Sequence, residues 1–285
     1  MPSLFDALER LAAYGADGLL PDARNTLVRS LANRRAAQGG FNGLDGRSDP
    51  YYTFFGWLSL RALRTPYDRD ELCAAMARHT RAANPVDAAC ARLLLAVEKR
   101  TVFRAVLTGW ASLWRAGDPY GVFLASLTLP LRPRRIMRLI WRARRLRPDS
   151  PAPEDSPTPR LAAGVLLAAL ADRDTAPHAA ALAARHHVAG GYASAPGIPP
   201  DLLATAVARF ALGRLASPAK NPGTEASRAE DLAFIEACWM GDGLFGASPV
   251  AAQGDTEHTF YGLLALGTCR PDQMGADSGL PNPHP

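Results

Sequence analysis

The chain of 285 residues lacks the features that would mark a secreted or a membrane-spanning protein. Its start, Met1 to Asp6, has no basic region followed by an apolar stretch, so we expect no signal peptide. The longest uncharged apolar run, Leu161 to Ala171, is about half as long as a membrane-spanning helix. These absences predict a cytoplasmic protein.

Cysteine pairs with metal-binding spacing are also lacking. The four cysteines lie far apart and form no CxxC motif. We expect reduced thiols, without a disulfide or metal framework. β-Branched residues are sparse, whereas alanine, leucine and arginine dominate, and this composition favours helix over sheet. The hydrophobic content of 48% is typical of a globular protein with a sizeable core.

Positive charge is concentrated in one segment. Residues 132–147 hold eight arginines and no acidic residue, although the net charge of the whole chain is only +5. Ile136, Leu139 and Ile140 fall on one stripe of this predicted helix. It is either a solvated outer helix or a contact surface for an acidic protein partner or an anionic membrane surface. The second role would make the protein peripheral to a membrane. Because no nucleic-acid recognition fold accompanies the patch, we expect no nucleic-acid partner.

A repeat is present at three places in the chain. In each copy an aspartate is followed by threonine at plus four, a small residue at plus seven, an apolar one at plus nine and leucine at plus eleven. The copies begin at Asp49, Asp201 and Asp255, each after a turn that combines glycine with an aromatic residue. We predict that each aspartate is the N-cap of a helix, where its carboxylate accepts hydrogen bonds from free backbone N–H groups.

Weaker copies at 87–99, 118–130 and 158–171 extend the pattern. Amphipathic stretches precede or separate these segments, at residues 22–37, 68–83, 101–116, 133–147, 176–188 and 228–240. The sequence therefore predicts an all-α protein of six helical hairpins closed into an α/α toroid, with one helix of each hairpin inside and one outside. We assign residues 22–269 to this single domain, 1–21 to an added N-terminal helix and 270–285 to a disordered tail.

Two copies of the repeat are similar to those of a known family. Residues 39–43 (GGFNG) with 49–54 (DPYYTF) look like the GGFxG…DxxYTF repeat of protein prenyltransferase β-subunits. Residues 255–263 (DTEHTFYGL) are similar to the last repeat of that family, DxxHTxxGL. The chain also resembles squalene–hopene-type cyclases in its periodicity. This resemblance implies an α/α toroid whose central cavity accepts a hydrophobic isoprenoid or polyene chain.

The chemistry of that family does not carry over intact. The resemblance places its zinc ligands at Asp201, Leu203 and His258, and leucine offers no lone pair. We therefore expect no zinc and no other cofactor. The basic residues of the diphosphate site correspond to Ala195 and Ile198, which cannot neutralise phosphate. The acidic DxDD motif of the cyclases is missing as well.

His258 and Glu257 are the candidate acid–base pair, and Asp201 is a third catalytic candidate. The plainer alternatives are a hydrogen-bonded structural histidine and a helix cap. His186 and His187 precede a glycine turn and are predicted to face solvent. Aromatic residues are the candidates for substrate binding, with packing of the toroid wall as the alternative. They are Tyr51, Tyr52, Phe55, Trp57, Tyr192 and Tyr261.

Three functions stay open on the sequence. The first is a prenyltransferase- or cyclase-like enzyme that catalyses metal-independent cyclisation, isomerisation or transfer. The second is a non-catalytic binding or scaffold protein that keeps the toroid without the zinc and diphosphate sites. The third is zinc-dependent protein prenylation with an α-subunit. A deep pocket holding Tyr51, Glu257 and His258 together would favour an enzyme, and a cavity plugged by side chains would favour a scaffold.

Overall fold

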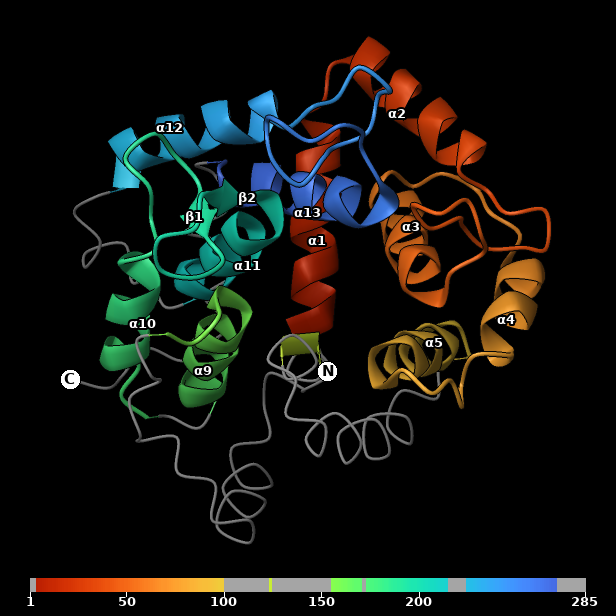
Figure 1. The fold of residues 1–285 in the computed structure, drawn as a ribbon, viewed down its shortest axis with the longest axis horizontal. Helices are drawn as coiled ribbons and strands as arrows, with labels where there is room; N and C mark the ends of the chain where they lie inside the picture. The colour runs from red at the N-terminus through yellow and green to blue at the C-terminus, as the bar shows by residue number, and fades with distance from the viewer. Residues whose placement is uncertain (1–3, 100–122, 125–154, 171–172, 215–223, 271–285) are drawn as a thin grey trace, which may run out of the picture.

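A computed structural model describes residues 4–99, 123–124, 155–170, 173–214 and 224–270 (Figure 1). This part of the chain is mostly helical, which confirms the all-α class. Within these residues, no helix has both the length and the hydropathy needed to cross a bilayer. The arginine-rich segment 132–147, the predicted third hairpin apart from residues 123–124, and all but the first residue of the predicted tail lie outside the described residues.

Five helices stand side by side as an inner row. Each packs against its neighbour in the order α5, α3, α13, α11, α9 (Figure 1). Their bounds are Pro85–Glu98 for α5, Pro50–Ala62 for α3, Thr256–Thr268 for α13, Leu202–Gly213 for α11 and Thr158–Leu170 for α9. Because α13 of the last repeat packs between α3 and α11, the first and the last repeat share one wall.

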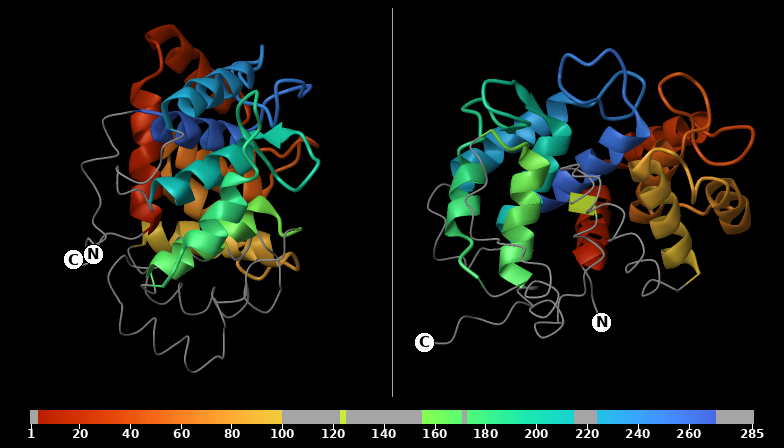
Figure 2. Two further views of the ribbon diagram at one scale, coloured as in Figure 1. Left: turned by 90° about the vertical axis from the view of Figure 1, so that its left-hand side faces the viewer. Right: turned by 60° about the horizontal axis from the view of Figure 1, so that its bottom comes forward.

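Four further helices lie on the outside of this row, as Figures 1 and 2 show. They are α2 (Pro21–Asn33), α4 (Arg69–Ala77), α10 (Ala176–Ala183) and α12 (Thr224–Ala237). Each precedes an inner helix along the chain, and α4, α10 and α12 also contact the inner helix that follows them. A short antiparallel ribbon of β1 (Tyr192–Ala193) and β2 (Pro200–Asp201) leads into α11 and was not expected from the sequence.

The three aspartates of the repeat are N-caps, as predicted. The side chains of Asp49, Asp201 and Asp255 each accept backbone hydrogen bonds from the first turn of α3, α11 and α13. The weaker copy at 87–99 differs, because its helix begins at Pro85 and is capped by Asn84. Proline suits the first position of a helix, where its missing N–H costs nothing, so the start expected at Asp87 was wrong by about half a turn.

The threonine of the repeat forms a hydrogen bond with the turn that precedes the helix. In all three copies its Oγ1 accepts a hydrogen bond from the buried backbone N–H of the turn's aromatic residue. The pairs are Thr53 with Phe41 at 2.9 Å, Thr205 with Tyr192 at 2.9 Å and Thr259 with Phe245 at 3.2 Å. A buried N–H without a partner is costly, which explains why a hydroxyl recurs at this position.

The small residue at plus seven makes room for the same aromatic ring. A Cβ added to Gly56 would lie 2.6 Å from the Phe41 ring, and one added to Gly262 would lie 2.6 Å from the Phe245 ring. The turn aromatic therefore packs flat against the backbone of the inner helix. Aspartate, threonine and small residue together fix how each loop meets its inner helix.

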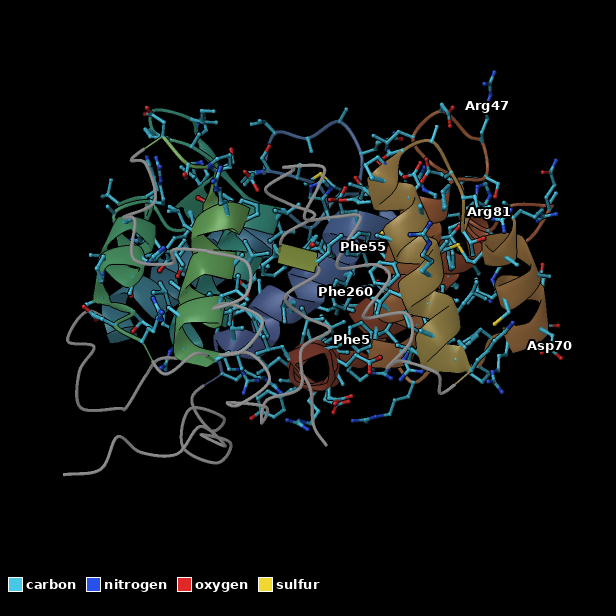
Figure 3. All side chains as sticks on the ribbon, turned by 90° about the horizontal axis from the view of Figure 1, so that it is seen from below. Phe5, Arg47, Phe55, Asp70, Arg81 and Phe260 are labelled. Atoms are coloured by element: carbon cyan, nitrogen blue, oxygen red, sulfur yellow. The ribbon has the colours of Figure 1, made fainter. Side chains whose placement is uncertain are left out.

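Helix α1 (Leu4–Asp17) packs across α13 and α3 rather than standing apart from them. It crosses α13 at the glycines Gly15 and Gly267, where the two backbones approach closely. Phe5 stacks on Trp57 of α3 with ring centroids 6.2 Å apart, and Figure 3 shows Phe5 on the α1 side of the inner row. Residues 4–17 thus belong to the core of the described structure.

Candidate acid–base site

A polar group joins the N-terminal ends of α3 and α13. Glu257, on the first turn of α13, accepts a hydrogen bond from the hydroxyl of Tyr51 on the first turn of α3. Beside it, Thr256 Oγ1 donates to the carbonyl of Tyr52 at 2.8 Å. These residues are 206 and 204 positions apart in the chain. They meet because the first and last repeats are neighbours.

Glu257 is buried, with only 8% of its surface exposed. Burial disfavours the carboxylate and raises its pKa to about 7. The positive charge of His258 and the hydrogen bond from Tyr51 act in the opposite direction, and the negative charges of Asp255 and Asp201 add to the rise. Near neutral pH, Glu257 therefore populates both its protonated and its ionised form.

His258 is held by Asp255, the cap of its own helix. One carboxylate oxygen of Asp255 accepts the backbone N–H of His258 at 2.8 Å, and the other lies 2.8 Å from its Nδ1. Burial alone would lower the pKa of His258. The hydrogen bond to Asp255, together with the charges of Asp255, Glu257 and Asp201, raises that pKa instead. The imidazolium form is favoured at this place.

Aromatic rings pack against the polar group. The ring of Tyr51 lies 4.9 Å from that of Phe55, which in turn lies 5.3 Å from Tyr261 and 5.8 Å from Phe260. Figure 3 shows Phe55 and Phe260 directed into the interior between α3 and α13. Phe55 and Tyr261 are each only 1% exposed, whereas Tyr51 is half-buried. An apolar aromatic wall therefore borders the Tyr51–Glu257 pair.

Two of the predicted substrate-binding residues lie elsewhere. Trp57 is fully buried, and its indole Nε1 donates at 2.8 Å to Glu98, the last residue of α5. The ring of Tyr192 lies 5.0 Å from that of His186, on the α10–α11 hairpin. Both residues serve packing where they stand, since their contacts do not include the Tyr51–Glu257 pair.

Asp201 caps α11 through the backbone N–H of Ala204 at 2.7 Å. Burial raises the pKa of its carboxyl, and the positive charge of His258 is close enough to act against that rise. Asp201 thus lies within electrostatic reach of His258 and Glu257. It contributes charge to the site while its hydrogen bonds serve the helix.

A second cluster forms around Asp231 of α12, which is fully buried. Its carboxylate binds the Arg209 guanidinium, His186 Nε2 at 2.9 Å and the backbone N–H of Gly191 at 2.7 Å. The prediction that His186 faces solvent was wrong. The buried carboxylate of Asp231 needs hydrogen-bond partners, and it is 45 residues from His186 in the sequence, so no local pattern indicates the contact. His187 is exposed as expected. The cluster ties α11 and α12 to the glycine turn between α10 and β1.

Three side chains could hold a metal ion. Asp255, Glu257 and His258 each offer one ligand atom, and these atoms lie within 4.8 Å of one another. They differ from the set that the resemblance implies, in which Leu203 replaces the cysteine. In the structure, Glu257 already binds Tyr51 and His258 Nδ1 already binds Asp255. These contacts engage Glu257 and His258 Nδ1, whereas His258 Nε2 has no hydrogen-bond partner within the described part of the chain.

The sequence predicted Glu257 and His258 as a pair but not the contact of Asp255 with the His258 side chain. Asp255 was expected only as a cap. Its contact with His258 has a local signal, because residues three apart on the first turn of a helix lie on one face. The Tyr51–Glu257 contact has no such signal, since it depends on which repeats become neighbours.

Comparison of the chain with protein-family models and with curated proteins gave no match. The likeness to prenyltransferase and cyclase repeats therefore rests on the repeat residues themselves.

Proposed function

We propose that this protein is a prenyltransferase- or cyclase-like toroid of six hairpins that transfers protons to and from a hydrophobic isoprenoid or polyene chain. Glu257 and His258 are its acid–base pair, and no metal takes part. The substrate chain approaches the pair at Tyr51, the half-buried ring of the aromatic wall. Isomerisation or cyclisation of a carbon–carbon double bond is the reaction class.

The Tyr51–Glu257 hydrogen bond carries this proposal. It holds a buried carboxyl whose pKa is about 7, next to a histidine whose pKa is also raised. Catalytic acids and bases work best when their pKa lies near the operating pH. Because Glu257 and His258 each act on the pKa of the other, the two groups titrate as a coupled pair.

The step balances without a co-reactant. Protonated Glu257 gives its proton to one carbon of a double bond, and the positive charge develops on the adjacent carbon. Loss of a proton from a neighbouring carbon to neutral His258 restores a double bond at a new position. Attack by a second double bond on the cation closes a ring and moves the positive charge to another carbon, and loss of a proton next to that carbon to His258 then restores a double bond. Transfer of the proton from His258 to the Glu257 carboxylate regenerates the starting state. Aromatic faces such as that of Tyr51 stabilise the positive charge.

Deuterium incorporation tests the proposal. The purified protein is incubated in D₂O with farnesol or with squalene, and the recovered lipid is analysed by mass spectrometry. A carbon-bound deuterium is expected with the wild type. Glu257→Gln should abolish incorporation, and the control Glu230→Gln, which changes an exposed carboxylate on α12, should retain it. Equal incorporation by wild type and Glu257→Gln would refute the role of Glu257.

A non-catalytic binding or scaffold protein is the second candidate. Phe55, Trp57 and Tyr261 are each at most 1% exposed, so these rings fill the interior of the described part. Ala195 and Leu203 replace the phosphate-binding and zinc-binding residues that the resemblance implies. Native mass spectrometry separates the candidates. Retention of farnesol or squalene favours the enzyme, whereas a protein that binds neither and incorporates no deuterium favours the scaffold.

A further inference from the structure

We propose that Asp255 is a positioning residue that keeps a proton on His258 Nδ1 and leaves Nε2 as the nitrogen that exchanges protons. The inference rests on the proposed function, because it names which atom of His258 acts. It goes beyond that function by assigning a role to a residue that the repeat pattern explains only as a helix cap.

The hydrogen-bond roles follow from the geometry. Asp255 Oδ2 lies 2.8 Å from His258 Nδ1. An ionised carboxylate can only accept hydrogen bonds, so Nδ1 must be the donor. A neutral imidazole carries one proton, and with that proton on Nδ1 the lone pair is on Nε2. The protonated ring keeps the same Nδ1–H bond and adds a proton at Nε2.

The orientation of the ring is fixed at the same time. Asp255 Oδ1 accepts the backbone N–H of His258 at 2.8 Å while Oδ2 binds the side chain. Both oxygens of one buried carboxylate are thus bonded to a single residue. Because the first of these bonds is the cap of α13, the imidazole is tied to the start of the helix.

Nε2 is the nitrogen that remains for chemistry. Within the described part of the chain it has no hydrogen-bond partner, and it is not among the buried atoms that lack one. The side chain of His258 keeps 15% of its surface exposed. A substrate at the N-terminal end of α13 would therefore meet Nε2, with Glu257 beside it.

The other repeats show that capping does not require histidine. Asp49 and Asp201 cap their helices with the same geometry, yet the residue three positions later is Tyr52 in one case and Ala204 in the other. Only the last of the three repeats places an imidazole within reach of its cap. The cap alone does not account for the second bond of Asp255.

Nitrogen NMR of the full chain labelled with ¹⁵N-histidine tests the proposal without any substrate. The long-range ¹H–¹⁵N spectrum is recorded at alkaline pH, where the imidazole is neutral, and His258→Gln assigns the signals by their loss. The Nδ1–H tautomer is expected in the wild type. Asparagine can cap the helix but would donate to Nδ1, so Asp255→Asn should move the proton to Nε2. The control Asp49→Asn should leave the signals of His258 unchanged.

Each outcome decides the assignment. An Nε2–H tautomer in the wild type, or no change in Asp255→Asn, would overturn it. If Asp255→Asn does not fold, Asp255→Ser keeps a capping oxygen and removes the partner of Nδ1, and the wild-type spectrum still settles the tautomer. In the deuterium assay, Asp255→Asn should lower the rate by roughly 10²–10⁴-fold. An inactive wild type with the Nδ1–H tautomer would refute the proposed function and leave the positioning role standing.

Discussion

The first and the last repeat share one framework and differ in what they carry on it. Both have an aspartate cap, a threonine that binds the turn and a glycine that admits the turn's aromatic ring. At plus two and plus three, however, the first repeat has Tyr51 and Tyr52 whereas the last has Glu257 and His258. The framework is shared, and the proposed chemistry depends on two positions of the first helical turn.

This difference explains why the site needs both ends of the chain. In the proposed function the last repeat provides the acid and the base, and the first repeat provides the hydroxyl that binds Glu257. Contact between α3 and α13 brings them together. The predictions below test whether the two repeats behave alike in stability and differently in chemistry.

The largest expected effect is on the rate of deuterium incorporation when His258, at plus three of the last repeat, is changed. His258→Gln removes the imidazole and should reduce deuterium incorporation into farnesol or squalene by roughly 10²–10⁴-fold. Glu230→Gln should stay within about threefold of the wild type, because that carboxylate is exposed on α12. Mass spectrometry of the recovered lipid measures both. Similar rates in both variants would show that the last repeat carries no special chemistry.

A glycine substitution should cost the same in both repeats. Gly56→Ala and Gly262→Ala each place a methyl group against an aromatic ring, so each should lower the free energy of unfolding by up to about 3 kcal/mol. Gly213→Ala, near the end of α11, meets no atom within 4 Å and should be neutral or stabilising by about 0.5 kcal/mol. Urea denaturation gives all three values. If Gly56→Ala and Gly262→Ala lowered the free energy of unfolding by very different amounts, the two repeats would not share one structural framework.

The pH dependence of stability should separate the two repeats. Glu257 has a raised pKa of about 7 when folded, against an ordinary value of 4.5, so the native state binds more protons between these values. Stability should therefore fall as pH rises through this window, by on the order of 2 kcal/mol. Glu257→Gln should match the wild type at pH about 5 and exceed it at pH about 8. Denaturation midpoints that differ equally at both pH values would contradict the burial argument.

The smallest effect concerns the threonines. Thr53→Val, Thr205→Val and Thr259→Val each leave one buried N–H without its partner, so each should lower the free energy of unfolding by about 1–2 kcal/mol. Serine at the same positions keeps the hydroxyl and should restore most of the loss. Chemical denaturation of the six variants measures the change in the free energy of unfolding. A cost limited to one repeat would mean that the shared framework has different roles.

Much of the described fold was predictable because its signals are local. The caps at Asp49, Asp201 and Asp255, the aromatic turns and the hairpin order all follow from a short repeated frame. The roles of the threonine and the glycine were not foreseen, since a recurrent residue does not name its partner. A cap can also shift, as Asn84 did in place of Asp87, when proline sets the first turn.

The site was predictable only in part. Glu257 and His258 could be proposed from the sequence because they stand at chemically distinctive positions of the last repeat. Their partners are of two kinds. Asp255 is close in sequence and could have been inferred from the spacing, whereas Tyr51 is 206 residues away and depends on tertiary packing. The burial that raises the pKa of Glu257 likewise comes from neighbouring helices.

The most direct test of the central claim is a titration of the Glu257 carboxyl by ¹³C NMR, with Glu257→Gln to assign its signal. The account predicts a midpoint near pH 7, caused by burial, and a further rise in Tyr51→Phe, which removes the hydrogen bond that favours the carboxylate. A midpoint at the ordinary value of 4.5 would mean that Glu257 is ionised near neutral pH, which would contradict its proposed role as an acid.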